Sequence, residues 1–175
     1  MSHFDCTLCP LGSMGTRAVE GEGPKPADIM LVGEAPGYNE ARLGRPFVGK
    51  AGQLLDRILD AAGLSRKDVY ITNTVKHRPP ENRTPVAHEV ATCRIFLDEE
   101  YEQVKPKVTV LMGGTASREI FNVSSTKANG VWRFTDGRVY VGMVHPSYLQ
   151  RGRPASEIQE VVEIFKKVRE YVETN

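Results

Sequence analysis

The amino-acid sequence predicts a single α/β domain in which a four-stranded parallel sheet lies between two layers of helices. Four short apolar runs have the length and composition of buried strands, and glycine or polar residues follow each of them. The four runs are residues 28–33, 69–73, 108–113 and 139–144. Segments with helical periodicity lie between them, and this βαβα alternation is typical of a parallel sheet covered on both faces.

Helical periodicity is found between the strands and at the C-terminal end of the chain. The first helix is predicted around residues 54–62, where apolar residues recur at helical spacing and Gly63 is placed to end the helix. Residues 91–104 and 117–121 are expected to form the second and third helices. A terminal amphipathic helix is predicted from the apolar positions Ile158, Val161, Val162, Phe165, Val168 and Val172.

The composition argues against a protein that spans a membrane or carries a strongly charged surface overall. The 175 residues include 23 Lys and Arg against 22 Asp and Glu, a formal charge of +1 that argues against a strong global attraction to nucleic acid or membranes. Any basic surface must therefore be local. No basic and apolar leader opens the chain, and no apolar stretch approaches the roughly 18 residues of a membrane span. A soluble intracellular protein with no membrane partner is expected.

The segment GRPFVGKAG (residues 44–52) comes close to a phosphate-binding loop. Gly44, Gly49 and Lys50 are in register with that motif, but Ala51 stands where a hydroxyl would bind Mg²⁺. A phosphate-binding loop follows a buried strand, whereas this loop follows a polar run. The sequence therefore argues against a nucleoside triphosphatase and leaves Phe47 with another task.

Three chemically distinct residues are expected at one edge of the sheet. Glu34, Asn73 and His145 each lie at or just after the carboxyl end of a different predicted strand. Ligands of open α/β sheets bind outside those ends. Each residue alone has an ordinary structural explanation, but an acid, an amide and an imidazole together predict a catalytic site.

The motifs GEAPG, GRPFVGKAGQLLDRIL, YITNTVKHRPPENRTP and VHPSYL carry a resemblance. In this order they are similar to the family 4 uracil-DNA glycosylases, the iron–sulfur branch of that superfamily, and the similarity extends over residues 6–153. The same domain type resembles a segment of certain phage DNA polymerases. The resemblance implies a four-stranded sheet and a pocket for a uracil flipped out of DNA.

The resemblance also implies residue roles. Phe47 would stack on the flipped uracil in a pocket that includes Gly33, and the amide of Asn73 would accept from uracil N3–H and donate to O4, which cytosine cannot match. Hydrolysis of the N-glycosidic bond needs stabilisation of a cationic sugar and an anionic base. Glu34 would serve the sugar and its water, and His145 would donate to uracil O2.

DNA contacts are implied around the same loops. Leu149, four residues after His145, matches the position of an apolar wedge that fills the gap left by the flipped base. Polar and basic residues expected to contact phosphates are Ser147, Arg151, Arg153, Lys76 and Arg83. The DNA partner is expected to be single- or double-stranded, and a sliding clamp is a conceivable partner for which no segment argues. By resemblance, the protein is expected to act as a monomer in the cytoplasm, at the nucleoid of a prokaryote or in a phage-infected cell.

Cysteine spacing points to a metal. Cys6 and Cys9 form a Cys-x-x-Cys pair before any strand, where a thioredoxin-like motif is not expected. By resemblance, Cys93 matches a third ligand of a 4Fe–4S cluster, and His77 stands where the family has its remaining cysteine. Histidine can ligate iron, so the expectation is a Cys₃His 4Fe–4S cluster. The alternatives are zinc in the same Cys₃His shell and a cluster with three protein ligands.

The expected activity is a monofunctional glycosylase that leaves an abasic site, with no lyase step and no covalent trapping of uracil. Two alternatives remain. One is a non-catalytic DNA-binding or polymerase-associated module. The other is a glycosylase for another deaminated base, such as hypoxanthine.

Overall fold

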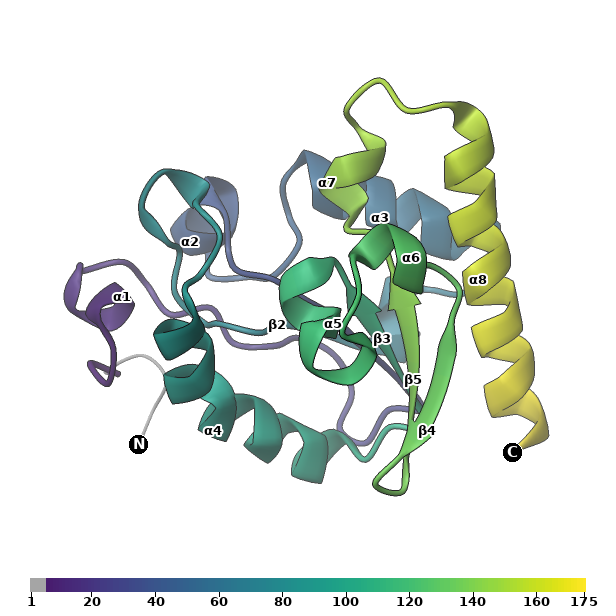
Figure 1. The fold of residues 1–175 in the computed structure, drawn as a ribbon, viewed down its shortest axis with the longest axis horizontal. Coiled ribbons are helices and arrows are strands. Elements are labelled where there is room, and N and C mark those ends of the chain that lie inside the picture. The colour runs from purple at the N-terminus through teal and green to yellow at the C-terminus, as the bar shows by residue number, and fades with distance from the viewer. Residues whose placement is uncertain (1–5) are drawn as a thin grey trace.

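The computed structural model describes residues 6–175, so the first five residues of the expected 1–175 domain lie outside the described part (Figure 1). Its centre is a five-stranded sheet with the order β2-β1-β3-β5-β4. The strands β1 (Ile29–Gly33), β2 (Val69–Asn73), β3 (Val108–Met112) and β5 (Arg138–Met143) are parallel, and this confirms the predicted α/β architecture.

The predicted count of four strands was one too low. Strand β4 (Trp132–Thr135) pairs antiparallel with β5 at the edge of the sheet. A tight turn joins the two strands, and its central residues Asp136 and Gly137 have φ values of 52° and 71°. An Asp-Gly pair between two extended runs is a strong hairpin signal. The strand was missed because most of it is exposed and has no apolar run.

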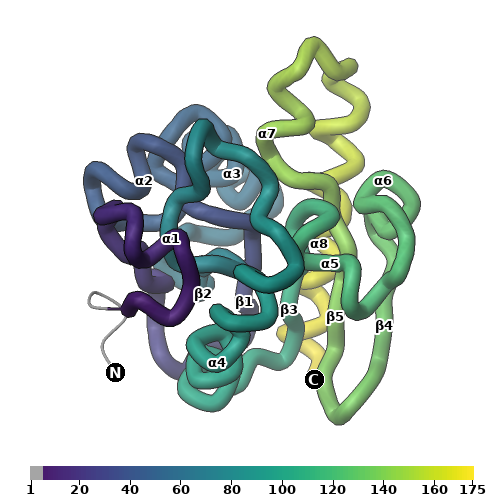
Figure 2. Tube along the Cα trace, turned by 60° about the vertical axis from the view of Figure 1, so that its left-hand side comes forward, coloured from purple at the N-terminus to yellow at the C-terminus, as the bar shows by residue number. Residues whose placement is uncertain are grey.

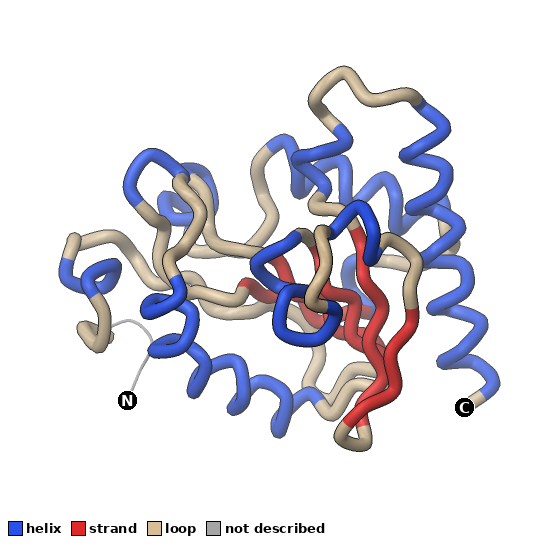
Figure 3. The backbone as a smooth tube through the Cα atoms, in the orientation of Figure 1, coloured by secondary structure: helices blue, strands red, loops and turns tan. Residues whose placement is uncertain are grey.

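Helices cover both faces of the sheet (Figures 1 and 3). On one face, α3 (Lys50–Ala61) and α8 (Ala155–Thr174) pack on alternate strand residues such as Leu31 and Val110. Burial of these side chains is the main free-energy gain that holds the two layers together.

The opposite face is covered by α4 (Ala87–Val104) and α5 (Gly114–Phe121), which pack on the intervening strand residues, such as Met30 and Leu111. Successive strand residues point to opposite faces, so the uninterrupted apolar runs follow from burial on both sides. Helix α4 begins before the predicted residue 91 because Glu89 Oε1 accepts from the Val86 N–H at 2.8 Å and caps the first turn.

Four short α-helices and the 3₁₀ helices Arg66–Asp68 and Pro80–Asn82 complete the described chain, and α2, α6 and α7 contribute residues to a cavity at the sheet edge. Helices α2 and α7 lie above the carboxyl ends of the strands in Figure 1, and Figure 2 shows α1 at the same side of the molecule as α2. No helix among residues 6–175 has the length and apolar character needed to cross a membrane. The short helices are α1 (Pro10–Ser13), α2 (Tyr38–Leu43), α6 (Ser125–Ala128) and α7 (Pro146–Leu149).

Candidate active site

The predicted convergence at the sheet edge is present in the structure. Glu34 directly follows β1, Asn73 ends β2, and His145 lies two residues beyond β5. The parallel strands β2, β1, β3 and β5 are adjacent, so their carboxyl ends open on the same edge. All three side chains, together with Phe47, line one cavity of about 610 Å³. The cavity is therefore built from segments that lie far apart in the chain.

Phe47 is held in the cavity wall by an unusual backbone conformation. Its φ is 51°, in the left-handed region that non-glycine residues rarely adopt. Arg66 donates to the Phe47 carbonyl at 2.8 Å and to the Pro46 carbonyl. A Cβ on Gly52 would lie 1.9 Å from the Phe47 carbonyl oxygen, so only glycine fits there. The surrounding structure thus fixes a strained turn that places the ring.

The carboxylate of Glu40 ties the same turn to helix α2. Its Oε2 accepts from the backbone N–H groups of Val48 and Gly49 at 2.9 and 2.7 Å, and its Oε1 accepts from Gly37 at 3.1 Å. The segment before the turn is α2 and not a strand. The rejection of a phosphate-binding loop therefore agrees with the structural context of residues 44–52.

The ring of Phe47 lies against the two residues expected to handle the base. Its centroid is 5.7 Å from that of His145, with 29° between the ring planes. A Cβ on Gly33 would come within 2.5 Å of the Phe47 ring and 2.6 Å of Asn73 Oδ1. The absence of a side chain at Gly33 is what allows the aromatic ring and the amide to meet.

The hydrogen bonds and the burial of His145 favour a neutral imidazole ring. Its Nδ1 accepts from the backbone N–H of Ser147 at 3.1 Å and lies 2.8 Å from the Ser147 hydroxyl. Burial, and to a smaller extent the nearby charge of Arg151, lowers the pKa of His145 from 6.5 to about 4. Because Nδ1 is an acceptor, the single proton of the neutral ring belongs on Nε2.

Glu34 is fixed at both its backbone and its side chain. Thr115, in the first turn of α5, donates to Glu34 Oε2 at 2.8 Å. The Glu34 carbonyl accepts from the Val75 N–H at 3.1 Å. The Thr115 hydroxyl therefore holds one of the two oxygens of the Glu34 carboxylate. Sequence reasoning missed Thr115, although the polar exit GGTAS after β3 was the available signal.

Asn73 presents an unsatisfied acceptor at the cavity. The residue is 2% exposed, and its Oδ1 is buried with no hydrogen-bond partner among residues 6–175. Buried polar atoms are rarely left unpaired, and one that is needs an explanation. An N–H group of a ligand in the cavity would supply the missing donor.

Two residues predicted to contact DNA are buried instead. Lys76 is 1% exposed, and its Nζ donates to Glu100 Oε2 at 2.8 Å and to the Asn73 carbonyl at 2.7 Å. Leu149 is 3% exposed and packs in the core beside α3. Lys76 therefore cannot reach a phosphate, and Leu149 cannot act as a wedge in this conformation. A basic residue within a loop motif does not reveal by itself which way it points.

The other predicted DNA contacts lie at or near the cavity. Ser147, Arg83 and Arg151 line it. Arg83 also forms an ion pair with Glu89 at 2.7 Å. Arg153 stacks its guanidinium 4.6 Å from the centre of the Tyr148 ring, and Tyr148 lines the cavity too.

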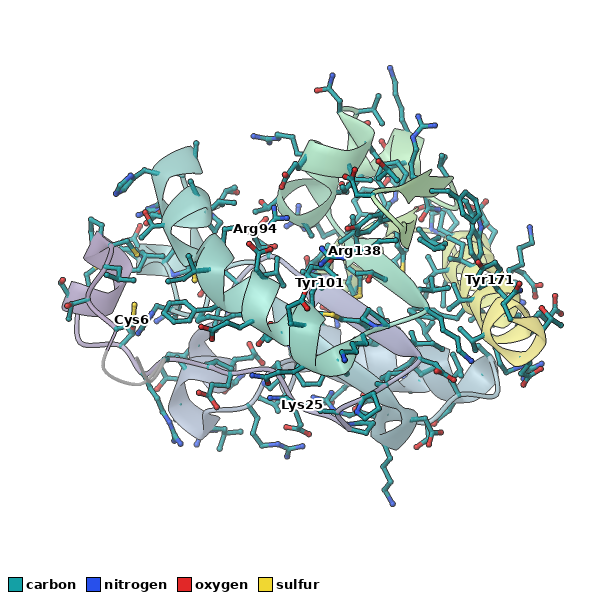
Figure 4. All side chains as sticks on the ribbon, turned by 90° about the horizontal axis from the view of Figure 1, so that it is seen from below. Cys6, Lys25, Arg94, Tyr101, Arg138 and Tyr171 are labelled. Atoms are coloured by element: carbon teal, nitrogen blue, oxygen red, sulfur yellow. The ribbon has the colours of Figure 1, made fainter. Side chains whose placement is uncertain are left out.

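The four predicted metal ligands share one small cavity. Cys6, Cys9, His77 and Cys93 line a space of about 10 Å³ near α1, and Figure 4 shows Cys6 at the end of the molecule opposite Tyr171 of α8. Burial raises the pKa of the Cys93 thiol to about 11. The donors are of the soft type that binds iron–sulfur clusters or zinc. A space of this volume holds about one water molecule, and no three such side chains in residues 6–175 are arranged to hold a metal.

The fold is an α/β fold, and its cavity at the sheet edge brings together an aromatic ring, an amide, an imidazole and a carboxylate. The sequence profile of the uracil DNA glycosylase superfamily matches residues 20–169. The chain belongs to the uracil DNA glycosylase superfamily.

Similar proteins support the same placement. The chain is 42% identical to the type-4 uracil-DNA glycosylase of Thermotoga maritima over 171 residues, which covers 95% of this chain and 89% of the relative. It is also 42% identical to the type-4 uracil-DNA glycosylase of Sulfurisphaera tokodaii, with 95% and 80% of the two chains covered. A DNA polymerase of Bacillus phage SP01 is 31% identical over 80% of this chain, but the match covers only 15% of the polymerase.

Proposed function

We propose that this protein is a DNA repair enzyme that excises uracil by hydrolysing its N-glycosidic bond. The observation that carries the proposal is the unpartnered, buried Oδ1 of Asn73 beside the Phe47 ring. A flipped uracil that stacks on Phe47 would bring its N3–H to that oxygen. The match to type-4 uracil-DNA glycosylases over nearly the whole chain supports the same reaction.

Base selection follows from the amide. Uracil offers a donor at N3 and an acceptor at O4, which an amide can satisfy together. Cytosine has an acceptor and a donor at the corresponding atoms, so both pairs would be mismatched in a water-excluded cavity. A site built on such hydrogen bonds can discriminate by about 10⁴ to 10⁵.

Bond cleavage uses His145 and Glu34 on opposite sides of the breaking bond. Negative charge grows on uracil O2 as the bond lengthens, and the Nε2–H of neutral His145 stabilises it. The sugar becomes cationic, and the carboxylate of Glu34 stabilises that charge and orients the attacking water. The base leaves as the uracil anion, and the water adds to the sugar cation and releases a proton to the solvent. The anion takes up a proton, and an abasic site remains.

The DNA strand is held by the basic rim of the cavity. Arg151 and Arg83 line the cavity beside Ser147, and Arg153 lies next to it on Tyr148. Lys and Arg that neutralise phosphates supply affinity without reading sequence. The protein would act as a monomer in the cytoplasm on single- or double-stranded DNA, without a lyase step or a covalent base adduct.

The cysteine-rich end would hold a 4Fe–4S cluster, with zinc as the alternative. The ligands would be Cys6, Cys9, Cys93 and His77, which surround one cavity. Their side chains must move outward to admit a cluster, because the cavity is only about 10 Å³. Such a group would be structural, since none of its ligands lines the base-binding cavity. Iron, sulfide and zinc analysis of the purified protein distinguishes the two metals.

The decisive experiment is uracil release from a single-stranded oligonucleotide with one deoxyuridine, scored by alkaline cleavage of the abasic product. Glu34→Ala and Asn73→Ala are tested beside the wild type, and Phe134→Ala is the control because Phe134 lies far from the site on β4. Release by the wild type and the control, with loss in both site variants, supports the proposal. Absence of release from the folded, metal-loaded wild type contradicts it.

The same assay separates the two alternatives. Oligonucleotides that contain hypoxanthine or xanthine replace the uracil substrate, with the same variants. Release of hypoxanthine but not uracil would assign the protein to another deaminated base. The match to a phage DNA polymerase is the reason to retain a non-catalytic DNA-binding module as the second alternative. DNA binding without release of any base would support that alternative.

A further inference from the structure

Tyr38 is an exposed aromatic residue at the rim of the base-binding cavity. It begins α2, its side chain is 60% exposed, and it lines the cavity. Among residues 6–175, eight other large apolar side chains are exposed, and none of them lines the cavity. A single exposed apolar side chain is ordinary, so it is the position of Tyr38 on the cavity wall that makes the ring a candidate ligand contact.

One face of the Tyr38 ring is covered by a cation. The Arg78 guanidinium lies 5.4 Å from the ring centre. Asn82 holds Arg78 in place, because the Arg78 Nε donates to Asn82 Oδ1 at 2.7 Å. With Arg78 on one face, the opposite face of the ring is the one available to a ligand. A cation–π contact of this kind also orients a ring that would otherwise rotate freely.

The cavity is larger than one flipped base requires. Its volume of about 610 Å³ lies within the range of pockets that bury drug-sized ligands. A single pyrimidine ring is smaller than such a ligand. Phe47 and Asn73 occupy the inner wall, whereas Tyr38 stands on the segment that follows the GEAPG loop. The remaining volume beside Tyr38 is therefore open to a second part of the DNA strand.

We propose that Tyr38, braced by Arg78, is a stacking subsite for the nucleobase that neighbours the flipped uridine on the same strand. This subsite rests on the proposed function. Aromatic side chains stack any nucleobase, because every base has a π-face. A neighbour base can stack on Tyr38 only after it leaves its own duplex stack. The subsite therefore favours single-stranded DNA and contributes to binding more than to bond cleavage.

Substitution of Tyr38 tests the subsite. Base–aromatic stacking is worth about 1–3 kcal/mol, so we expect the KM for a single-stranded deoxyuridine oligonucleotide to rise about fivefold or more in Tyr38→Ala, with kcat unchanged. Tyr38→Phe should retain wild-type KM, and Tyr38→Leu, which is apolar without a π-face, should not. The matched control is Phe134→Ala, which removes an aromatic side chain of 66% exposure from β4.

A substrate change locates the partner base. Oligonucleotides with an abasic analogue at either the 5′ or the 3′ neighbour of the deoxyuridine remove one stacking base at a time. One of them should raise the wild-type KM to that of Tyr38→Ala, and Tyr38→Ala should not respond to it.

Two results would overturn the inference. One is a Tyr38→Ala variant with the KM of the Phe134→Ala control. The other is a Tyr38→Ala defect that persists undiminished on both abasic-flanked substrates. Failure of the proposed function is a separate result, because it appears as no uracil release by the wild-type protein.

Discussion

The hydroxyl of Thr115 lies 2.8 Å from Oε2 of Glu34 and joins the exits of strands β3 and β1. The contact crosses between two adjacent parallel strands. It engages one oxygen of the carboxylate and so sets the direction in which the other oxygen faces. A carboxylate that orients water must hold its position through the reaction, because misplacement costs rate even when binding is intact.

Removal of the Thr115 hydroxyl should therefore slow catalysis without weakening binding. A hydrogen bond to a charged group is worth about 1.5–3 kcal/mol, so Thr115→Val should lower kcat about tenfold or more and leave KM unchanged. Thr115→Ser, which keeps the hydroxyl, is the matched control. Single-turnover uracil release measures the effect, and equal rates for the two variants would contradict it.

The depressed pKa of His145 predicts a pH dependence of stability. The folded-state pKa is about 4 against 6.5 for the ordinary value, because the ring is buried. As the pH falls, His145 therefore takes up a proton at a higher pH in the unfolded chain than in the folded protein. The stabilising contribution is full above pH 6.5, declines between pH 6.5 and about 4, and amounts to about 3 kcal/mol over that window.

Urea unfolding of the wild type and His145→Gln over this pH range isolates the contribution of His145. The wild type should lose more stability than the variant as the pH falls, while the other histidines affect both proteins alike. Nitrogen NMR of the wild-type imidazole should show the Nε2–H tautomer at neutral pH. A His145 ring that titrates near pH 6.5 would disprove the assignment.

The buried Lys76–Glu100 pair predicts a separation of stability from activity. Glu100 also accepts from the hydroxyls of Thr72 and Tyr70 at 3.0 and 3.3 Å, so the pair belongs to a hydrogen-bonded network. Glu100→Ala leaves a buried ammonium without its carboxylate and should lower the free energy of unfolding by about 3–5 kcal/mol.

The double variant Lys76→Met/Glu100→Leu should regain most of that stability, because apolar side chains replace both charges. Its kcat/KM should stay below the wild-type value, since the Asn73 carbonyl has lost the donor that Lys76 supplies at 2.7 Å. Urea unfolding and uracil release measure the two effects. Full recovery of activity in the double variant would show that Lys76 does not position Asn73.

Loss of Cys6, a proposed metal ligand, should affect the fold and not the choice of base. Cys6→Ala should lower the melting temperature and the affinity for DNA, because the N-terminal segment would lose its attachment to α4 and to the loop after β2. The ratio of uracil to hypoxanthine release should not change. Met14→Ala, an exposed substitution just beyond α1, is the control. A switch of base preference in Cys6→Ala would contradict a structural role.

The sequence allowed the sheet edge to be predicted because strand ends are set by local patterns. Glu34, Asn73 and His145 each follow an apolar run, and parallel pairing brings such positions together without further information. Strand β4, which contains Trp132 and Phe134, has no comparable apolar run because it faces solvent at the edge of the sheet. The turn that follows β4 was the remaining sequence signal for it. The strand order and the antiparallel edge therefore needed the structure.

The direction in which a side chain points was the second property that could not be predicted from the sequence. Lys76 and Leu149 belong to the loops that form the site, and both were expected at its surface. Lys76 turns inward because Glu100 on α4 offers a charge partner that is distant in sequence. Leu149 turns inward because α7 packs its apolar side against α3. In both cases the partner is distant in the chain, and local sequence carries no signal of it.

The left-handed turn at Phe47 has a kinetic consequence. Arg66, Glu40 and the close approach of Gly52 hold that turn at several independent points, so the ring stands ready before any ligand arrives. A preformed slot does not need to close around its occupant. Under the proposed function, a uracil that has already left the DNA stack would meet the ring without any rearrangement of this turn.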